Sequence, residues 1–124
     1  MSAPNLRDRY LQDSISTASP AKLLIMLYDR LILDLMQGEE AIRGNDRELA
    51  NDKITHAQEI VLELRVTLDM EAWDGAPGLA NLYGFVLTEL IGANIRQDAD
   101  RVVGCRNLLE PLRDAWRDAA SAST

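Results

Sequence analysis

The chain has 124 residues, of which 47% are hydrophobic and 27% are charged, and its formal net charge is −7 at pH 7. This length predicts one domain with a single core. The negative charge disfavours binding to nucleic acid or to anionic lipid, because both partners attract basic surfaces. Neither a signal peptide nor a membrane-spanning run is present, and Cys105 has no second cysteine to pair with, so we expect a cytoplasmic protein without membrane insertion.

Hydrophobic residues recur with a period near 3.6, which predicts an all-α fold. Residues 1–18 form a polar, Ser-rich lead, which we expect to be a short helical or extended cap segment. A helix shorter than about 12 residues is marginal in isolation. Order in this segment would therefore depend on contacts made by Tyr10 and its neighbours.

The pair Ser19-Pro20 predicts the start of the first long helix, because serine caps helix N-termini and proline fits the first helical position. We expect this helix to end near Arg43, with Gly44 as a left-handed terminating residue. It is apolar on nearly every side. Its core stripe contains Leu24, Leu27, Tyr28, Leu31 and Leu35, a second stripe contains Ile25, Ile32 and Met36, and a third contains Met26 and Leu33.

The second helix is predicted from Asn45, which with Glu48 gives a capping-box pattern, to about Leu68. The joint with the first helix is so short that the two helices should form an antiparallel hairpin. The predicted core positions of this helix are Leu49, Ala57, Ile60, Val61, Leu64 and Leu68. Leu62 and Val66 fall on the opposite side, one turn apart.

Residues 69–78 form a turn-rich loop, which precedes a third helix over about 79–97. This helix has a core stripe of Leu79, Tyr83, Val86 and Leu90, widened by Ile91 and Ile95. Asp98 is the expected cap of a fourth helix reaching about residue 118, with a frayed tail at 119–124. Its core stripe is Val102, Cys105, Leu109, Leu112 and Trp116, and Pro111 should interrupt it. Two hairpins joined by one loop predict an antiparallel up-down four-helix bundle over 19–118, in one domain.

The bundle has more apolar side chains than its core can hide. Each one left in water forgoes about 1.5–3 kcal/mol of burial free energy, and a contiguous exposed patch usually marks an interaction surface. The N-terminal segment, the long loop, a second copy of the chain or a dedicated partner are all possible covers.

The sequence offers no constellation for catalysis, metal binding or a cofactor, so we predict that the protein is not an enzyme. His56 is the only histidine, and the acidic residues are expected to be solvated. A lone helical histidine also fits a histidine phosphotransfer bundle, although "AQEI" after His56 lacks the nearby cation that such a site needs. A self-associating helical adaptor is a second alternative.

Four segments together resemble the FliS family of flagellar secretion chaperones. They are "YLQDSISTASPAKLLIMLYDRL" (10–31), "AQEIVLELRVTLD" (57–69), "LANLYGFVLTELIGANIRQD" (79–98) and "LEPLRDAW" (109–116). The resemblance implies a helical bundle that binds the disordered C-terminal segment of flagellin, prevents premature polymerisation and presents its client to the export gate.

Under this hypothesis the client lies as helices on the surplus apolar side chains. The candidate contacts are Ile25, Met26, Ile32, Leu33, Met36, Leu62, Val66, Ile91 and Ile95. Tyr10 and Ile15 match the family signature, and we expect them to fold residues 1–18 over the bundle, either as a displaceable cover or as a permanent cap. We expect a monomer or a weak homodimer.

Overall fold

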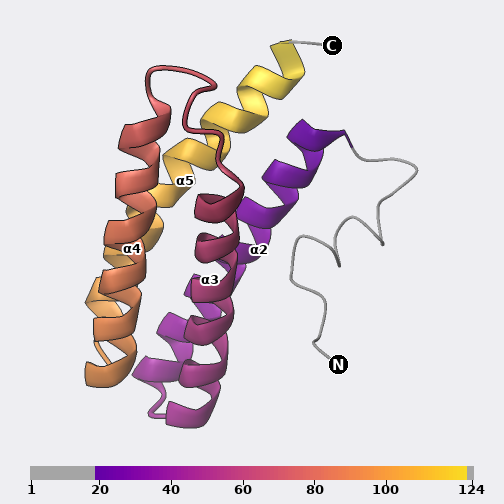
Figure 1. Ribbon diagram of the computed structural model, residues 1–124. Coiled ribbons are helices and arrows are strands. Elements are labelled where there is room, and N and C mark those ends of the chain that lie inside the picture. Colours follow the sequence, from indigo (N-terminus) through magenta and orange to yellow (C-terminus); the bar gives the residue numbers. More distant parts are fainter. Residues whose placement is uncertain (1–18, 123–124) are drawn as a thin grey trace, which may run out of the picture.

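A computed structural model of the chain describes residues 19–122 and contains four α-helices (Figure 1). They are α2 (Pro20–Arg43), α3 (Arg47–Thr67), α4 (Ala76–Arg96) and α5 (Ala99–Ala122). Successive helices run antiparallel, so the predicted all-α, up-down four-helix bundle is confirmed. The expected N-terminal cap, with Tyr10 and Ile15, lies outside the described residues.

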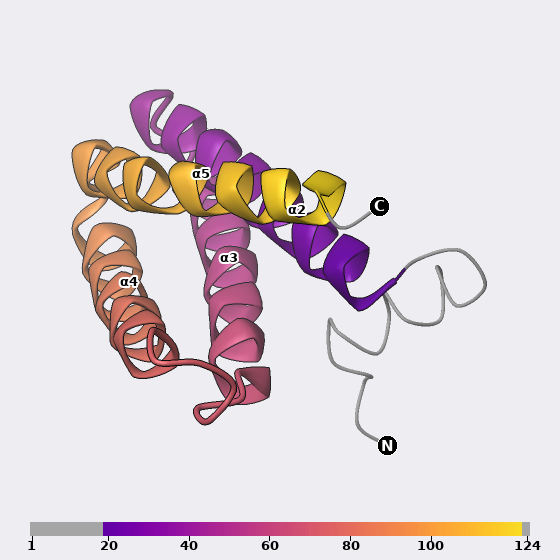
Figure 2. The same cartoon turned by 90° about the horizontal axis from the view of Figure 1, so that it is seen from above.

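The four helices form a ring in which each helix packs against two others. α2 contacts α3 and α5, and α4 contacts the same two helices. Figure 2 shows the bundle from above, with α5 lying across α2 and with α4 on the far side of α3 from α2. The α2–α3 and α2–α5 contacts are the most extensive, and the α4–α5 contact is the least extensive.

Local capping signals explain where most helices begin. The Ser19 side chain accepts a hydrogen bond from the Lys22 amide at 3.2 Å, as the sequence predicts. Asp98 accepts one from the Arg101 amide at 3.2 Å, which confirms the predicted cap of α5. α5 then continues through Pro111 without a break and reaches Ala122, beyond the expected end near residue 118.

The α2–α3 turn differs from the prediction by one residue. Gly44 has φ −88° and is not left-handed, whereas Asn45 has φ 60° and supplies the left-handed conformation that the turn needs. Asparagine tolerates this region of backbone space better than most residues. Because Asn45 is used in this way, Asp46 caps α3 and accepts the Leu49 amide at 3.1 Å. The assignments of Gly44 and Asn45 were therefore wrong.

α4 begins at Ala76, three residues before the expected start at Leu79. Pro77 and Gly78 look like turn residues in the sequence. Proline is nevertheless well tolerated in the first turn of a helix, where its missing N–H has no partner to lose. The connecting loop therefore covers only residues 68–75.

The core lies along the inward faces of all four helices. Tyr28 and Tyr83 are fully buried and their hydroxyl groups share a hydrogen bond between α2 and α4. Cys105 is a buried residue of the α5 stripe, as expected. Leu49 was expected in the core but is exposed, whereas the adjacent Ala50 faces the core and Ile54 is buried beside Gly38.

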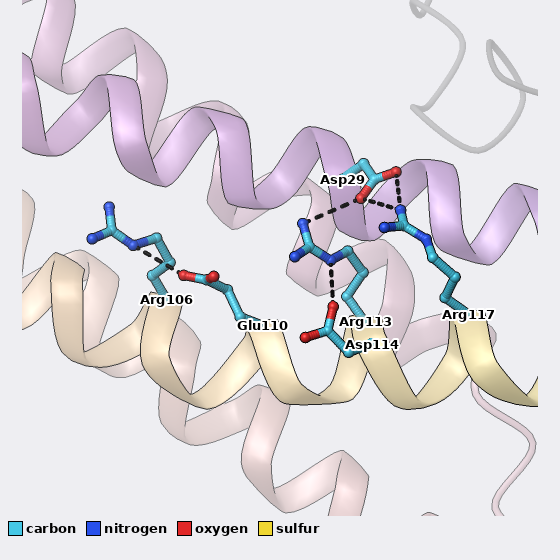
Figure 3. Close-up of polar contacts among 6 residues, drawn as sticks. All are labelled: Asp29, Arg106, Glu110, Arg113, Asp114 and Arg117. Atoms are coloured by element: carbon cyan, nitrogen blue, oxygen red, sulfur yellow. Dashed lines mark hydrogen bonds and ion pairs between the residues drawn. The ribbon is translucent and has the colours of Figure 1, made fainter.

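Ion pairs run along the α2–α5 contact (Figure 3). Asp29 of α2 accepts hydrogen bonds from Arg117 at 2.8 and 3.0 Å and from Arg113 at 3.4 Å. Nearly three turns along α2, Glu39 binds Arg106 at 2.7 Å. Ile32 lies between Asp29 and Glu39 and is only 4% exposed. α5 therefore packs over this part of the second apolar stripe of α2.

The sequence predicted that the acidic side chains are solvated, and Asp34 is an exception. Asp34 of α2 is fully buried, and its carboxylate lies 3.5 Å from the Arg30 guanidinium. His56 of α3 binds the other carboxylate oxygen through Nδ1. These contacts join α2 to α3 by a charged cluster inside an otherwise apolar contact.

Candidate apolar binding surfaces

A cavity of about 390 Å³ opens at the end of the bundle where α2 and α4 begin and where α3 ends. We call it the end pocket. Its walls are mainly aliphatic and aromatic, and they contain both tryptophans of the chain. The lining residues are Pro20, Leu23, Leu24, Leu27, Leu64, Thr67, Leu68, Asp69, Trp73, Leu79, Tyr83 and Trp116.

The α3–α4 loop forms one wall of the end pocket. Trp73 lies over Gly75 so closely that a Cβ added to Gly75 would be 1.8 Å from its ring. The Trp73 side chain is nevertheless 51% exposed, and Met70 beside it is also exposed. No helical periodicity marks this wall, although a tryptophan within a turn-rich, acidic loop is a signal that could have revealed it.

A second set of exposed apolar side chains lies on α3 and α4, and we call it the α3–α4 face. It contains two apolar pairs, each one helical turn apart, whose exposures are 51% for Leu62, 71% for Val66, 47% for Ile91 and 70% for Ile95. A hydrogen bond of 2.8 Å from Asn94 to Asn51 links the two helices. All four residues were predicted from the sequence to lie outside the core.

The surplus stripes of α2 are only partly at the surface. Leu33 and Met36 are exposed, whereas Ile25 and Met26 are half-buried. Ile32 was a candidate contact, but its burial under α5 makes it a core residue in this structure. The helical wheel could not show this, because it gives the direction of a side chain but not which neighbouring helix covers it.

A third apolar feature, a hollow of about 530 Å³, lies between α4 and α5. Phe85 and Leu108 line this hollow and are both exposed. Gly104 also lines it, and a Cβ added to Gly104 would have no atom within 4 Å. Neither large residue was among the sequence-predicted contacts. Both residues lie outside the core stripes of their helices, at the α4–α5 contact, which is the least extensive of the helix contacts.

The histidine and the cysteine of the chain are both engaged in structural roles. His56 is bound to Asp34, and burial raises the pKa of the Cys105 thiol to about 12, which keeps it protonated near neutral pH. Within residues 19–122, no group of three His, Cys, Asp or Glu side chains could hold a metal ion. None of the helices between residues 19 and 122 has an apolar run of the length that a membrane span requires.

Comparison with known proteins gives a consistent result. The family described as "Flagellar protein FliS" matches residues 3–123. The flagellar secretion chaperone FliS of Campylobacter jejuni is 31% identical over 116 residues, which are 93% of this chain and 91% of that protein. The protein of the same name from Bacillus subtilis is 29% identical over 119 residues, covering 96% of this chain and 89% of its own length.

The fold is also shared with a solved structure. A crystal structure of a bacterial flagellar chaperone superposes with a TM-score of 0.78 at 22% sequence identity, and the match covers 93% of this chain and 94% of the other. With the family match extending over nearly the whole sequence, the chain belongs to the FliS family of flagellar secretion chaperones.

Proposed function

We propose that this protein is a cytoplasmic export chaperone for flagellin. It binds the disordered C-terminal segment of flagellin, prevents premature polymerisation and delivers the client to the flagellar export apparatus. The observation that carries this proposal is the α3–α4 face, where four large aliphatic side chains stand in water on two packed helices. Family membership supports the role in flagellar export.

The α3–α4 face suits a client that folds into a helix as it binds. Leu62 and Val66 on α3, and Ile91 and Ile95 on α4, are each spaced by four residues. A helix laid along this face presents its own apolar residues at the same one-turn spacing. Ordering a disordered segment costs about 2–5 kcal/mol of the gross interaction energy, so a broad apolar area is required to offset it.

The exposed residues of α2, Leu33 and Met36, extend the proposed client path beyond the α3–α4 face. Ile25 and Met26 border this area and contribute where they remain accessible. Methionine adapts its shape readily, which suits contacts with a client that folds on binding. A client that uses both areas would pass around the bundle as more than one short helix.

Residues 1–18 serve in this proposal as a displaceable cover held by Tyr10 and Ile15. Deleting residues 1–15 tests the idea. A displaceable cover predicts a folded protein with tighter or unchanged client binding. Loss of the cooperative unfolding transition after the deletion would instead identify a permanent cap.

The client role is tested by titrating the protein with a flagellin C-terminal peptide and following the gain in helical circular dichroism. The double variant Leu62→Asn, Ile91→Asn should weaken binding by about tenfold or more, because each truncated apolar anchor removes roughly 1 kcal/mol or more. Leu49→Asn is the matched control, since Leu49 is also an exposed leucine of α3 but lies outside the face. Equal binding by both variants and the wild type would refute the assignment of this face.

Oligomeric state gives an independent test. We propose a monomer or a weak homodimer, with export-gate components as further partners. Sedimentation at micromolar concentration should show monomer. A stable dimer that added flagellin peptide cannot dissociate would favour a self-associating adaptor, because the exposed apolar pairs would then be buried between copies of the chain.

A further inference from the structure

We propose that the end pocket is a second recognition site, which takes an apolar anchor flanked by lysine or arginine from a segment of a protein partner. This inference goes beyond the binding of flagellin on the α3–α4 face and does not depend on it. It rests on three features of the pocket, namely its aromatic walls, its uncompensated carboxylates and the exposed tryptophan on its rim.

The walls of the end pocket favour an apolar side chain. Leu24, Leu27 and Leu64 form aliphatic walls, and Trp73 and Trp116 add aromatic surface. A cavity of about 390 Å³ falls in the size range of sites that enclose a ligand group. Tyr83 also lines the pocket, and its hydroxyl is already hydrogen-bonded to that of Tyr28.

The rim of the end pocket is acidic. Asp69 lines it, and Glu71 and Asp74 follow on the same loop, which contains no lysine or arginine between Leu68 and Ala76. None of these three carboxylates forms an ion pair with any residue of the described part of the chain. The basic residues next to lining residues in the sequence are Lys22 in the first turn of α2, Arg65 of α3 and Arg117 of α5, and Arg117 is paired with Asp29. The loop therefore carries three carboxylates, one of which, that of Asp69, lines the apolar pocket.

The acidic groups of the α2–α5 contact behave differently. Asp29 is bound by two arginines, and Glu39 is bound by Arg43 and Arg106. Those carboxylates are neutralised within the bundle, so they leave little charge for a partner. The loop carboxylates are exposed and have no ion-pair partner within residues 19–122, although Asp69 accepts a hydrogen bond from the Glu71 amide at 3.0 Å. At about 0.1 M salt their field extends roughly 10 Å, enough to reach a cation next to a docked anchor.

Trp73 connects the apolar and acidic parts of the site. Its ring lies on Gly75 and forms part of the pocket wall, and half of its surface remains in water. Tryptophan is enriched among the residues that dominate binding energies at protein interfaces. A lysine or arginine beside the anchor can lie over the ring face while its charge approaches Asp69 or Asp74.

The experiment uses the full chain and two synthetic helix-forming peptides that lack tryptophan. Both peptides carry the same leucine anchor, flanked by lysines in one peptide and by glutamines in the other. Trp73 and Trp116 are the only tryptophans and both line the pocket, so tryptophan emission reports on this site. We expect the lysine peptide to shift the emission and to bind about tenfold more tightly at low salt, a difference of about 1.4 kcal/mol.

Two charge variants test whether the loop carboxylates cause the preference for the lysine peptide over the glutamine peptide. The triple variant Asp69→Asn, Glu71→Gln, Asp74→Asn should abolish this preference. The matched triple variant Glu48→Gln, Asp52→Asn, Glu59→Gln removes the same net charge from exposed positions of α3 and should retain it. All six side chains are at the surface, so both proteins should fold.

Several results would overturn the proposal. Equal affinity for the two peptides would do so, as would an unchanged preference in the loop variant or binding without a change in tryptophan emission. The chain's own N-terminal segment is the competing occupant, since Arg7 and Arg9 precede Tyr10. A change in the emission of an Arg7→Gln, Arg9→Gln variant before any peptide is added would assign the pocket to that segment. Flagellin binding to the α3–α4 face would be unaffected by any of these outcomes.

Discussion

His56 of α3 and Asp34 of α2 bind each other across the interface of the two helices, and the Asp34 carboxylate is completely buried. The Arg30 guanidinium lies 3.5 Å from the other carboxylate oxygen, which makes no hydrogen bond within the described residues. A buried charge is costly when it loses a partner, because desolvation is then no longer offset. His56 is therefore a structural partner of Asp34 in this fold.

Removing the histidine should destabilise the protein. In His56→Ala, Asp34 loses its hydrogen bond and keeps only the pair with Arg30, so we expect the free energy of unfolding to fall by about 1–3 kcal/mol. Urea denaturation followed by circular dichroism measures this change. The double variant Asp34→Asn, His56→Ala should be less destabilised than the sum of the single variants, because the two groups are coupled. An unaltered urea midpoint in His56→Ala would contradict this account.

Stability should fall at alkaline pH. Burial is the main cause that raises the pKa of Tyr28, of Tyr83 and of Cys105, the last from 9.0 to about 12. Above pH 9 the unfolded chain loses these protons while the folded chain retains them, so the free energy of unfolding decreases as pH rises. Each such group contributes a slope of about 1.4 kcal/mol per pH unit.

The contribution of the Cys105 thiol to this pH dependence can be separated from that of the two tyrosine hydroxyls. In Cys105→Ala the decrease should begin nearer pH 10, the ordinary range of tyrosine, because the thiol no longer contributes. Urea midpoints measured between pH 8 and pH 11 test both statements. The same onset in the variant and the wild type would show that Cys105 is not responsible for the early part of the loss.

Gly75→Ala should move Trp73 without unfolding the bundle. The new Cβ would be 1.8 Å from the indole ring, so the ring must leave its place on the pocket wall. We expect red-shifted tryptophan emission and a change in unfolding free energy below about 1 kcal/mol, since Gly75 has a φ that alanine also adopts. Gly78→Ala is the control, because nothing lies within 4 Å of its Cβ position.

Asp29 should help to hold α5 against α2. Replacing it with asparagine removes the pairs with Arg113 and Arg117 (Figure 3). The groups are partly exposed, so the expected loss is about 0.2–1 kcal/mol at low salt and less at high salt. Asp114→Asn serves as the comparison, because within the part of the chain that the structure describes Asp114 pairs only with the neighbouring Arg113. Equal effects of the two substitutions would indicate that the helix-to-helix pairs contribute nothing specific.

Features with a local cause could be predicted from the sequence. Ser19 and Asp98 cap their helices because a side chain that accepts a nearby amide needs no tertiary context. The turn between α2 and α3 was harder, since Asn45 and Asp46 are adjacent and both can cap a helix. The choice depends on which residue takes the left-handed conformation, and that depends on how the two helices meet.

Features with a tertiary cause could not be predicted. Ile32 and Met36 lie on the same stripe of α2, but only Ile32 is buried beneath α5. Asp34 looked like a surface acid because its partner is 22 positions away in the sequence. Residues of all four helices and of the α3–α4 loop line the end pocket. The periodicity within one helix cannot predict which residues of different helices come together. The α3–α4 face was easier, because its four residues simply remain where the helical wheel puts them.

The end pocket and the two tight turns, at 44–46 and 97–98, occupy opposite ends of the bundle (Figure 1). Dyes or spin probes for distance measurements are therefore best attached beside those turns, for example through Arg47→Cys in a Cys105→Ala background, because Arg47 is exposed and Asn45 itself is needed in the left-handed conformation. A bulky tag joined after α5 would sit near Trp116 and crowd the cavity. Assays of client or partner capture should therefore be repeated with untagged protein before a weak signal is interpreted.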